Sequence, residues 1–254
     1  MNIIGLQTLI EREVGRFMKV YMQTLLSPLV TTVLFFAIFS LGLPKGEEHL
    51  VMGVPFLQFL APGLVMMSMA QNAFSNTSSS LIIAKVQGNI VDTLMAPLGA
   101  FELLTGYLVG GVVRGFLVGV VSIVGLAFFI PIGFAHIWAI LAFGILGCTL
   151  MAALGLAGGL WADKFDHMAA ITNFIVTPLT FLSGTFYTID RLPEQVQHIA
   201  RFNPFFHMID GFRYGFVGAA DHPVWISFAV LSFCTTLVVL LAWRLLALGY
   251  KIKS

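Results

Sequence analysis

Long apolar stretches alternate with short polar ones along most of the chain. About 20 mostly apolar residues in a helix cross a hydrocarbon core of about 30 Å. Six stretches meet this criterion, at residues 25–43, 56–83, 101–130, 136–162, 168–189 and 223–248. Pro28 fits a first span that begins or bends there. The pattern predicts an all-α integral membrane protein with six transmembrane helices, in which residues 1–254 form a single transmembrane domain.

The segment before the first span, residues 1–24, is amphipathic. Its charged residues interrupt any apolar core that a signal peptide would need. Apolar and basic side chains repeat at steps of three and four on separate faces, at Leu6, Ile10, Val14, Phe17 and Tyr21, and at Arg12, Arg16 and Lys19. We expect a helix along the cytoplasmic interface, with its basic side towards anionic lipid headgroups or a partner.

The second span becomes polar on one face. At 100° per residue, seven small polar side chains fall within about 160° of the helix surface; they are Ser68, Gln71, Asn72, Ser75, Asn76, Ser78 and Ser79. In lipid, such a face must meet another helix, water or a substrate path. One interpretation is that these residues form hydrogen bonds between helices. Such contacts normally use one or two residues rather than seven, so a second interpretation stays open, in which Gln71, Asn72, Ser75 and Asn76 line a substrate path.

Small residues recur four apart in the third and fourth spans, which is typical of helices packed closely. They are Gly106 and Gly110, then Gly111, Gly115 and Gly119, and in the fourth span Gly155 and Gly159. Arg114 lies among these glycines. A charge there is costly in lipid, so we expect it to snorkel to the cytoplasmic interface; an ion pair in a transport path is the alternative.

Two segments outside the spans carry their own patterns. Residues 85–97 place Ile90, Val91, Leu94 and Met95 on a short amphipathic helix ended by Pro97, which predicts a cytoplasmic docking surface. Residues 190–222 mix aromatic side chains with Arg201, Asp210 and Arg213. This mixture favours extracellular re-entrant or interfacial helices, broken at Asn203-Pro204. Just before them, Pro178 is expected to kink the fifth span, whose outer end contributes Phe181, Phe186 and Tyr187 to a candidate outer gate.

The amino-acid composition narrows the class of protein. Hydrophobic residues make up 58% of the chain, charged residues 10%, and the mean hydropathy is +0.95, which excludes an ordinary soluble enzyme. The net charge of +1 without a dense basic cluster argues against nucleic acid as a partner. Cys148 and Cys234 lie in apolar runs and fit small buried hydrophobes rather than a disulfide.

Basic residues near the span ends orient the chain. With both termini cytoplasmic, the inner side holds Arg12, Arg16, Lys19, Lys85, Lys164, Arg244, Lys251 and Lys253, and the outer side holds Lys45, Arg191, Arg201 and Arg213. The excess of basic residues on the inner side favours this orientation.

Catalytic and nucleotide-binding signatures are absent from the sequence. It has no HExxH, GxSxG or CxxC pattern and no GxxxxGK[ST] loop. Asp163, Asp166 and His167 lie close together, but their position fits a helix end better than a metal site. We expect neither catalytic residues nor a cofactor or metal in this chain.

Several fragments in order resemble the type 2 ABC-transporter permease family over nearly the whole chain. They are FLAPGL at 59–64, NIVDTLMAP at 89–97, GGVVRGFLVG at 110–119, PLTFLSGTFY at 178–187, LP at 192–193, NP at 203–204 and DGFR at 210–213. Within these fragments, the positions expected to be structural are Gly110, Gly111, Arg114, Gly115, Pro178, Asn203, Pro204, Asp210 and Arg213.

The resemblance implies a permease that forms a homodimer and binds two copies of a separate ATPase, which holds ATP and Mg. Residues 1–24 would be the interface helix, and residues 190–222 the extracellular re-entrant helices. Residues 85–97 would be the coupling helix, with Lys85, Asn89, Ile90, Asp92, Leu94 and Pro97 as its candidate residues. The family often has Glu near Val91 and Asp92, and Asp92 keeps the carboxylate.

The implied function is the transmembrane permease of an ATP-binding cassette exporter in the bacterial cytoplasmic (inner) membrane. Its substrate path, lined by the second and fifth spans of both copies, would work by alternating access. The alternative is an ATP-independent channel or secondary transporter, which usually has ionisable groups at the midplane, where Arg114 is the candidate. A membrane-embedded enzyme and an assembly factor are further alternatives. The sequence leaves the exported substrate open.

Overall fold

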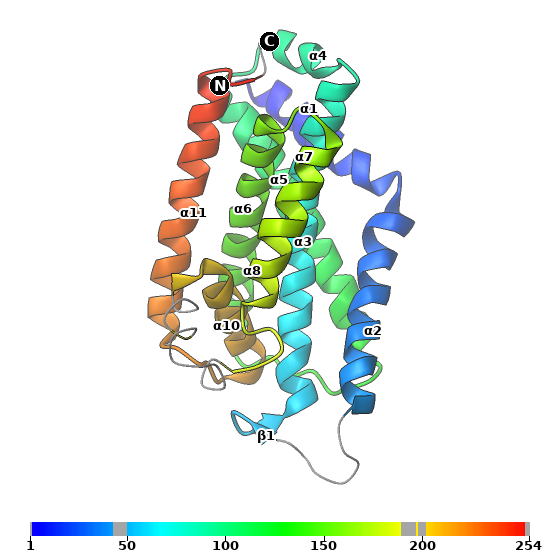
Figure 1. Cartoon of the computed structure of the whole chain (residues 1–254), viewed down its shortest axis with the longest axis vertical. Coiled ribbons are helices and arrows are strands. Elements are labelled where there is room, and N and C mark those ends of the chain that lie inside the picture. Colours follow the sequence, from blue (N-terminus) through cyan, green and yellow to red (C-terminus); the bar gives the residue numbers. More distant parts are fainter. Residues whose placement is uncertain (1, 43–49, 189–196, 198–201, 252–254) are drawn as a thin grey trace.

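The chain folds into a bundle of long helices that run roughly along one axis (Figure 1). The computed structural model describes residues 2–42, 50–188, 197 and 202–251. The helices are α1 (Ile3–Met18), α2 (Ser27–Gly42), α3 (Phe56–Val86), α4 (Ile90–Met95), α5 (Ala100–Ala127), α6 (Ile137–Trp161), α7 (Phe165–Ile171), α8 (Thr177–Phe181), α10 (Pro204–Val217) and α11 (Val224–Ala247). Two π-helical segments, η1 (Met22–Leu26) and η2 (Thr172–Val176), precede α2 and α8.

The helical membrane class predicted from the sequence is confirmed. Within the part of the chain that the structure describes, four helices are long and apolar enough to cross a membrane: Met22–Gly42, Ala100–Ala127, Ile137–Trp161 and Val224–Ala247. The predicted count of six spans stays a prediction, because it also needs α3 and the interrupted helix α7–η2–α8. Both lie within the bundle, and α1, α4 and the inner end of α11 lie together at one end of it (Figure 1).

A small antiparallel hairpin precedes α3 and was not predicted. Strands β1 (Leu50–Val51) and β2 (Val54–Pro55) pair Leu50 with Pro55 and Val51 with Val54. The two turn residues, Met52 and Gly53, have φ values of 53° and 79°. Both central residues of such a tight turn need positive φ. Four residues of hairpin are too short to give a periodic signal in the sequence.

Helix α3 lies at the centre of the bundle, in contact with α5, α6 and α10. Its N-terminal half is apolar, and Phe59, Leu60 and Met66 there are fully buried. Close packing against its neighbours depends on glycine. A Cβ added at Gly111 would lie 2.7 Å from Cβ of Ala152, and one at Gly115 would lie 3.0 Å from the carbonyl oxygen of Met69. The glycine spacing therefore brings the backbones of α3, α5 and α6 together.

The expected fifth span at residues 168–189 differs most from the structure. Its helix starts earlier, at Phe165, and ends at Phe181, with the π-helical segment η2 directly before α8. Pro178 lies in the first turn of α8, so the interruption comes just before this proline. After Phe181, the hydroxyls of Ser183 and Thr185 donate to the carbonyl of Thr180, and Gly184 adopts a φ of +72°. These turn contacts replace the last helical turns that apolarity alone predicted.

The predicted re-entrant region at residues 190–222 is described only in part. Residues 189–196 and 198–201, and with them Arg191 and Arg201, lie outside the described residues, as do 43–49 with Lys45. Helix α10 begins where Asn203 accepts a hydrogen bond of 3.0 Å from the N–H of Phe205, and it ends at Gly218, with a φ of 79°. We expected its aromatic residues near the outer headgroups, but most of α10 is buried against α3, α6 and α11.

Candidate functional site

Helix α4 is shorter than the predicted segment 85–97 and presents an apolar patch to the outside. The side chains of Val91 and Met95, four residues apart, are 54% and 79% exposed. Asp92 is exposed in the first turn, while Thr93 is buried towards the bundle. Asn89 is exposed just before the helix, Ile90 packs against the bundle, and Leu94 lies within the helix.

Both ends of segment 85–97 are tied to the same chain. Lys85 belongs to the last turn of α3, and its Nζ donates hydrogen bonds to the carbonyls of Leu160 and Ala162, at the end of α6. The carbonyl of Pro97 accepts a 3.4 Å hydrogen bond from Nδ2 of Asn2. The middle of the segment, with Asp92, is thus its exposed part.

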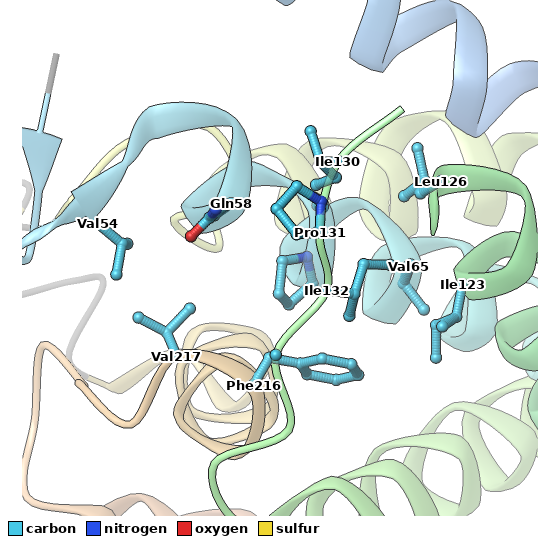
Figure 2. A pocket seen from close by; sticks show the side chains of 13 residues that line it. Val54, Gln58, Val65, Ile123, Leu126, Ile130, Pro131, Ile132, Phe216 and Val217 are labelled. Atoms are coloured by element: carbon cyan, nitrogen blue, oxygen red, sulfur yellow. The ribbon is translucent and has the colours of Figure 1, made fainter. Parts of the chain in front are cut away.

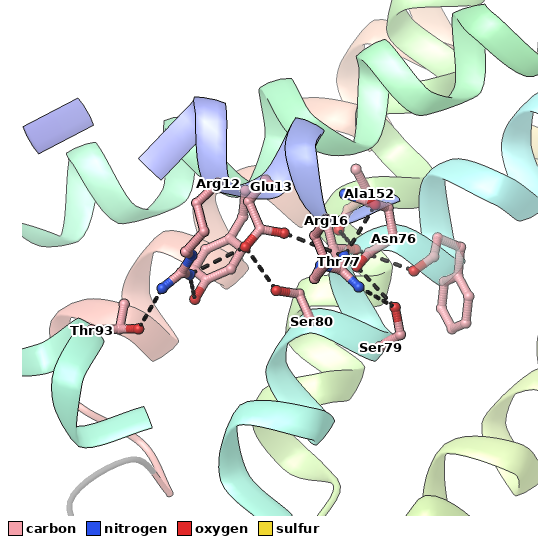
Figure 3. A network of polar contacts seen from close by, with 11 residues as sticks. Arg12, Glu13, Arg16, Asn76, Thr77, Ser79, Ser80, Thr93 and Ala152 are labelled. Carbon is pink, nitrogen blue, oxygen red and sulfur yellow. Dashed lines mark hydrogen bonds and ion pairs between the residues drawn. The ribbon is translucent and has the colours of Figure 1, made fainter. Parts of the chain in front are cut away.

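A buried ionic network joins α1 to this segment and to α3. Its centre is Glu13, whose side chain is 0% exposed (Figure 3). The Glu13 carboxylate accepts hydrogen bonds from Arg12 at 3.1 Å and from Ser80 at 2.8 Å, and from Arg16 at 3.3 Å. Arg12 in turn donates 2.9 Å to the hydroxyl of Thr93 in α4. One carboxylate therefore holds two cations that reach α3 and α4.

Arg16 ties the same network to the polar face of α3. It donates 2.7 Å to the main-chain carbonyl of Asn76, 3.1 Å to the Asn76 side-chain oxygen and 3.2 Å to the hydroxyl of Ser79. Asn76, a candidate path residue, is fully buried here. Arg12 and Arg16 thus meet their own chain, whereas we had expected the basic face to meet lipid headgroups or a partner; Lys19, the third basic residue of that face, is exposed.

The sequence analysis did not identify Glu13 as buried, because the predicted apolar face contained Ile10 and Val14, each one position after a residue that is buried in the structure. The buried positions of α1 are Leu9, Glu13 and Phe17, which follow one another at steps of four. The sequence did contain a signal for this burial, because Glu13 lies four residues after Leu9 and four residues before Phe17, on one face of the helix.

Two cavities flank the middle of the polar face of α3. One of about 200 Å³ lies between α2 and α3 and is lined by apolar residues together with Ser27, Thr31, Thr32, Ser68, Gln71 and Asn72. A smaller one of about 130 Å³ lies between α3 and η2–α8 and is lined by Gln71, Phe74, Ser75, Thr172, Val176 and Thr177. Gln71 borders both cavities, and its Nε2 lies 3.4 Å from the hydroxyl of Thr180.

The polar face is thus divided along its length. Gln71, Asn72 and Ser75 border cavities, whereas Asn76 and Ser79 bond to Arg16. Ser78 is buried. One stretch of α3 therefore uses its polar side chains for contacts with another helix, and a different stretch uses them to line the cavities.

The outer end of this polar region meets a cluster of phenylalanines. The ring of Phe186 stacks on Phe39 of α2 at 5.1 Å and on Phe181 at 5.7 Å between centroids. The hydroxyl of Tyr187 lies 3.4 Å from the carbonyl of Phe181. The three candidate gate residues therefore lie together, against α2.

Arg213, which we counted among the outer charges, is fully buried in α10. It donates 3.2 Å to the carbonyl of Phe59 and 2.7 Å to that of Gly184, and its guanidinium lies 3.7 Å from the centroid of the Phe59 ring. Asp210 accepts the backbone N–H groups of Asp221 at 2.8 Å and His222 at 3.1 Å. These two residues fasten α10 to α3, to the turn after α8 and to the turn before α11.

A further cavity of about 200 Å³ lies at the outer end, between the hairpin, α5 and α10 (Figure 2). Its lining is apolar except for the amide of Gln58, as Val65, Ile123 and Phe216 illustrate. It lacks the hydroxyl and amide groups that border the α2–α3 cavity, and we assign it no part in the site.

Of the residues Asp163, Asp166 and His167, which follow α6, Asp163 forms an ion pair with Lys251. Asp163 accepts a hydrogen bond of 2.7 Å from Lys251, which lowers the pKa of the Asp163 carboxyl from its ordinary value. Lys251 also donates 3.0 Å to the carbonyl of Trp161. Among the described residues, no group of three or more His, Cys, Asp and Glu side chains is placed to hold a metal ion.

Comparison with known proteins gives consistent relatives. The family described as ABC-2 type transporter matches residues 5–217. The "Inner membrane transport permease YadH" of Escherichia coli (strain K12) is 37% identical over 254 residues, covering 99% of this chain and 98% of YadH. "Nodulation protein J" of Rhizobium leguminosarum bv. viciae is 28% identical over 228 residues, covering 87% of this chain and 85% of that protein.

Proposed function

The chain belongs to the ABC-2 type transporter family, and from this membership we propose that it is the permease of an ATP-binding cassette exporter. The family is one of transport permease subunits rather than catalytic enzymes, so the chain is a membrane subunit of a transporter. In our proposal a separate ATPase binds ATP and Mg and supplies the energy, while this chain supplies the substrate path.

The observation that carries the proposal is the exposed patch of α4. Val91 and Met95 expose apolar surface beside the exposed carboxylate of Asp92, at the end of the bundle where α1 also lies (Figure 1). Exposed apolar side chains beside a charge are suited to a protein partner. A cleft of about 520 Å³ between α1, α3 and α4 adds concave surface next to this patch. The ATPase would dock there.

The network around Glu13 supplies a mechanical connection for such a partner. A push on α4 acts on Thr93, which is bonded to Arg12, and Arg12 is bonded to Glu13. Glu13 and Arg16 are bonded to Ser80 and Asn76 of α3. Movement of α4 would therefore be passed to the helix that carries the polar face, and the dimer would alternate between inward-open and outward-open states.

The exposed side of α2 supports a homodimer. Its outward residues follow each other at steps of three and four and are 55–86% exposed, namely Val30, Leu34, Ile38 and Leu41, and Leu26 of η1 continues the row. Two copies that face each other through α2 and α8 would enclose the polar stretches of both α3 helices between them. Two ATPases, one on each α4, would complete the assembly.

We place the protein in the bacterial inner membrane, as the name of the YadH relative indicates, with both termini and α4 cytoplasmic. The positive side chains of α1 and the inner ends of α3 and α11 agree with this orientation.

The deciding experiment is purification of the full chain from its own host in a mild detergent, followed by identification of the proteins that come with it. We expect a P-loop ATPase at equal stoichiometry and ATP-dependent transport after reconstitution. Transport that proceeds at the same rate without ATP would favour the channel or secondary-transporter alternative.

A further inference from the structure

Arg114 lies midway along α5, in a helix that is otherwise apolar over its central turns. The sequence favoured a side chain that snorkels to the cytoplasmic interface. Instead, Nη2 of Arg114 donates a 3.0 Å hydrogen bond to Oδ1 of Asn72, on the polar face of α3. The guanidinium is half-buried, and its Nε is buried without a hydrogen-bond partner.

The charge of Arg114 is not balanced by the residues around it. Among the described residues, no carboxylate forms an ion pair with Arg114. Arg16, a second cation that bonds to Asn76 one turn after Asn72, already has Glu13 and Ser79 as its other partners. A guanidinium among apolar helices needs a counter-charge or water.

The space next to Arg114 is suited to an anionic group. Asn72 accepts the hydrogen bond from Arg114 and also lines the cavity of about 200 Å³ between α2 and α3, whereas Arg114 itself is not among the lining residues. The Nδ2 of Asn72 donates 3.0 Å to the carbonyl of Ser68. Three hydroxyl side chains of the α2 side, Ser27, Thr31 and Thr32, line the same cavity. Phosphate and carboxylate oxygens accept hydrogen bonds from guanidinium, amide and hydroxyl donors. The apolar residues that complete the lining, such as Phe35 and Leu64, suit the hydrocarbon part of an amphiphile.

We propose that the α2–α3 cavity, with Arg114 behind Asn72, binds the anionic headgroup of an amphiphilic molecule. The inference deepens the proposed function and rests on it, because the anionic amphiphile would be the exported compound or a lipid that accompanies it. The headgroup supplies the counter-charge that Arg114 lacks, after Asn72 exchanges its bonds to Arg114 and to the carbonyl of Ser68 for bonds to the headgroup.

The test uses the full chain in nanodiscs of neutral phosphatidylcholine, with dodecyl phosphate and dodecyl maltoside as probes that share one tail. Dodecyl phosphate should raise the melting temperature more than dodecyl maltoside does. Arg114→Gln should weaken binding of dodecyl phosphate about tenfold or more and leave dodecyl maltoside unaffected, since one charge-assisted contact is lost. Arg244→Gln, which removes an exposed cation at the inner end of α11, is the matched control and should bind as the wild type does.

A second arm identifies the source of the headgroup. If phosphatidylglycerol in the nanodisc raises the melting temperature of the wild type but not of Arg114→Gln, and then competes with dodecyl phosphate, the site takes a bilayer lipid. If phosphatidylglycerol does not compete, the site takes a mobile amphiphile. Arg114→Lys keeps the charge and should keep the preference for dodecyl phosphate, which covers the case that Arg114→Gln does not fold.

Equal binding of dodecyl phosphate by wild type and Arg114→Gln would overturn the inference, and loss of the dimer in that variant would be a second result against it. The second result would assign the counter-charge to a second copy of the chain. Co-purification of the ATPase is measured on the same samples. A chain that binds dodecyl phosphate through Arg114 but carries no ATPase would reject the proposed exporter and not the anionic site.

Discussion

The carboxylate of Glu13 accepts a hydrogen bond of 2.8 Å from the hydroxyl of Ser80, and this contact joins the N-terminal helix to the central helix. Both residues are buried, and the same carboxylate holds Arg12 and Arg16. The charge of Glu13 is thus compensated by two cations that also contact α3 and α4.

Glu13→Gln should therefore destabilise the protein strongly. Removing one partner from a fully buried ion pair costs about 3–5 kcal/mol. Because the Arg12 and Arg16 side chains are 46% and 30% exposed, water compensates part of their charge, and we expect a cost at or below the lower end of that range. The loss of stability can be measured by thermal unfolding in detergent, in which the amount of monodisperse protein that remains is recorded as the temperature rises. Glu11→Gln is the matched control, since Glu11 is exposed one position from Arg12 and bonds only Gln7 among the described residues. Equal melting temperatures for both variants would contradict the central role of Glu13.

Asp92→Arg should weaken binding of the ATPase or uncouple its hydrolysis from transport, while the permease itself stays folded. Asp92 is exposed and forms none of the contacts that hold α4 to the bundle, so its loss leaves the fold intact. The measurement is the amount of ATPase that co-purifies and its hydrolysis rate.

The control for this substitution is Asp166→Arg. Asp166 is likewise an exposed carboxylate in the first turn of a short helix, α7, that starts at the inner end of the bundle. It should behave as the wild type does. A fully coupled Asp92→Arg complex would remove the assignment of α4 as the coupling helix.

Replacing Gln71 and Ser75 together with leucine should impair export without changing assembly. These two side chains border the cavities on either side of α3, so leucine fills polar space and removes hydrogen-bonding groups from the proposed path. The readout is the compound that accumulates inside a strain lacking this chain and is cleared when the chain is restored. Thr236→Leu, on the exposed face of α11, is the control. Unchanged clearance by the double variant would favour packing as the role of this face.

Cysteine labelling should report the two ends of the bundle on opposite sides of the membrane. Leu50 in the hairpin is 60% exposed, and Gln87 at the end of α3 is exposed as well. Leu50→Cys should react with a membrane-impermeant maleimide in cells whose inner membrane is intact, and Gln87→Cys only after that membrane is permeabilised. The native cysteines give a low background, because Cys148 is buried and Cys234 partly so. The reverse pattern would invert the proposed orientation.

The ion pair between Asp163 and Lys251 predicts a small pH dependence of stability. The pKa of Asp163 is lowered by its hydrogen bond with Lys251, below the ordinary value of about 3.9. The contribution to stability is therefore present above about pH 4 and is lost as the pH falls through the lowered pKa in the folded protein. The melting temperature of Asp163→Asn should lie slightly below that of the wild type near neutral pH at low salt, and the difference should vanish in acid. A difference that persists unchanged in acid would contradict this account.

The sequence predicted those parts of the fold that depend on apolar length and period. The helices now bounded by Ile137–Trp161 and Val224–Ala247 lie within one residue of the expected ranges 136–162 and 223–248, because lipid sets their length. The fifth helix differed because its end is fixed by hydroxyl contacts of Ser183 and Thr185, which hydropathy does not measure.

The site was less accessible to sequence reasoning than the fold. The polar face of α3 was visible as a pattern, but its division between Arg16 and the cavities depends on where α1 packs. Glu13 was noted only among the charges that interrupt the apolar run of residues 1–24, and Arg213 was counted with the outer charges and among the structural positions, so the burial of neither was predicted. Their burial follows from contacts with residues 67 positions away for Glu13 with Ser80, and 154 positions away for Arg213 with Phe59. No local pattern records such contacts.

Helix α3 has a consequence for biosynthesis. It has 31 residues, about 46 Å at 1.5 Å per residue, yet it is not among the four helices apolar enough to be recognised as membrane spans. Its polar groups find partners on other helices, as when Thr77 donates 2.7 Å to the carbonyl of Ala152 in α6 and Asn72 accepts from Arg114 in α5. These two partners are synthesised after α3, whereas the α1 partners of Asn76, Ser79 and Ser80 are synthesised before it. A helix of this kind partitions poorly by itself, so its stable insertion waits for α5 and α6, and early truncations of the chain should leave it outside the lipid.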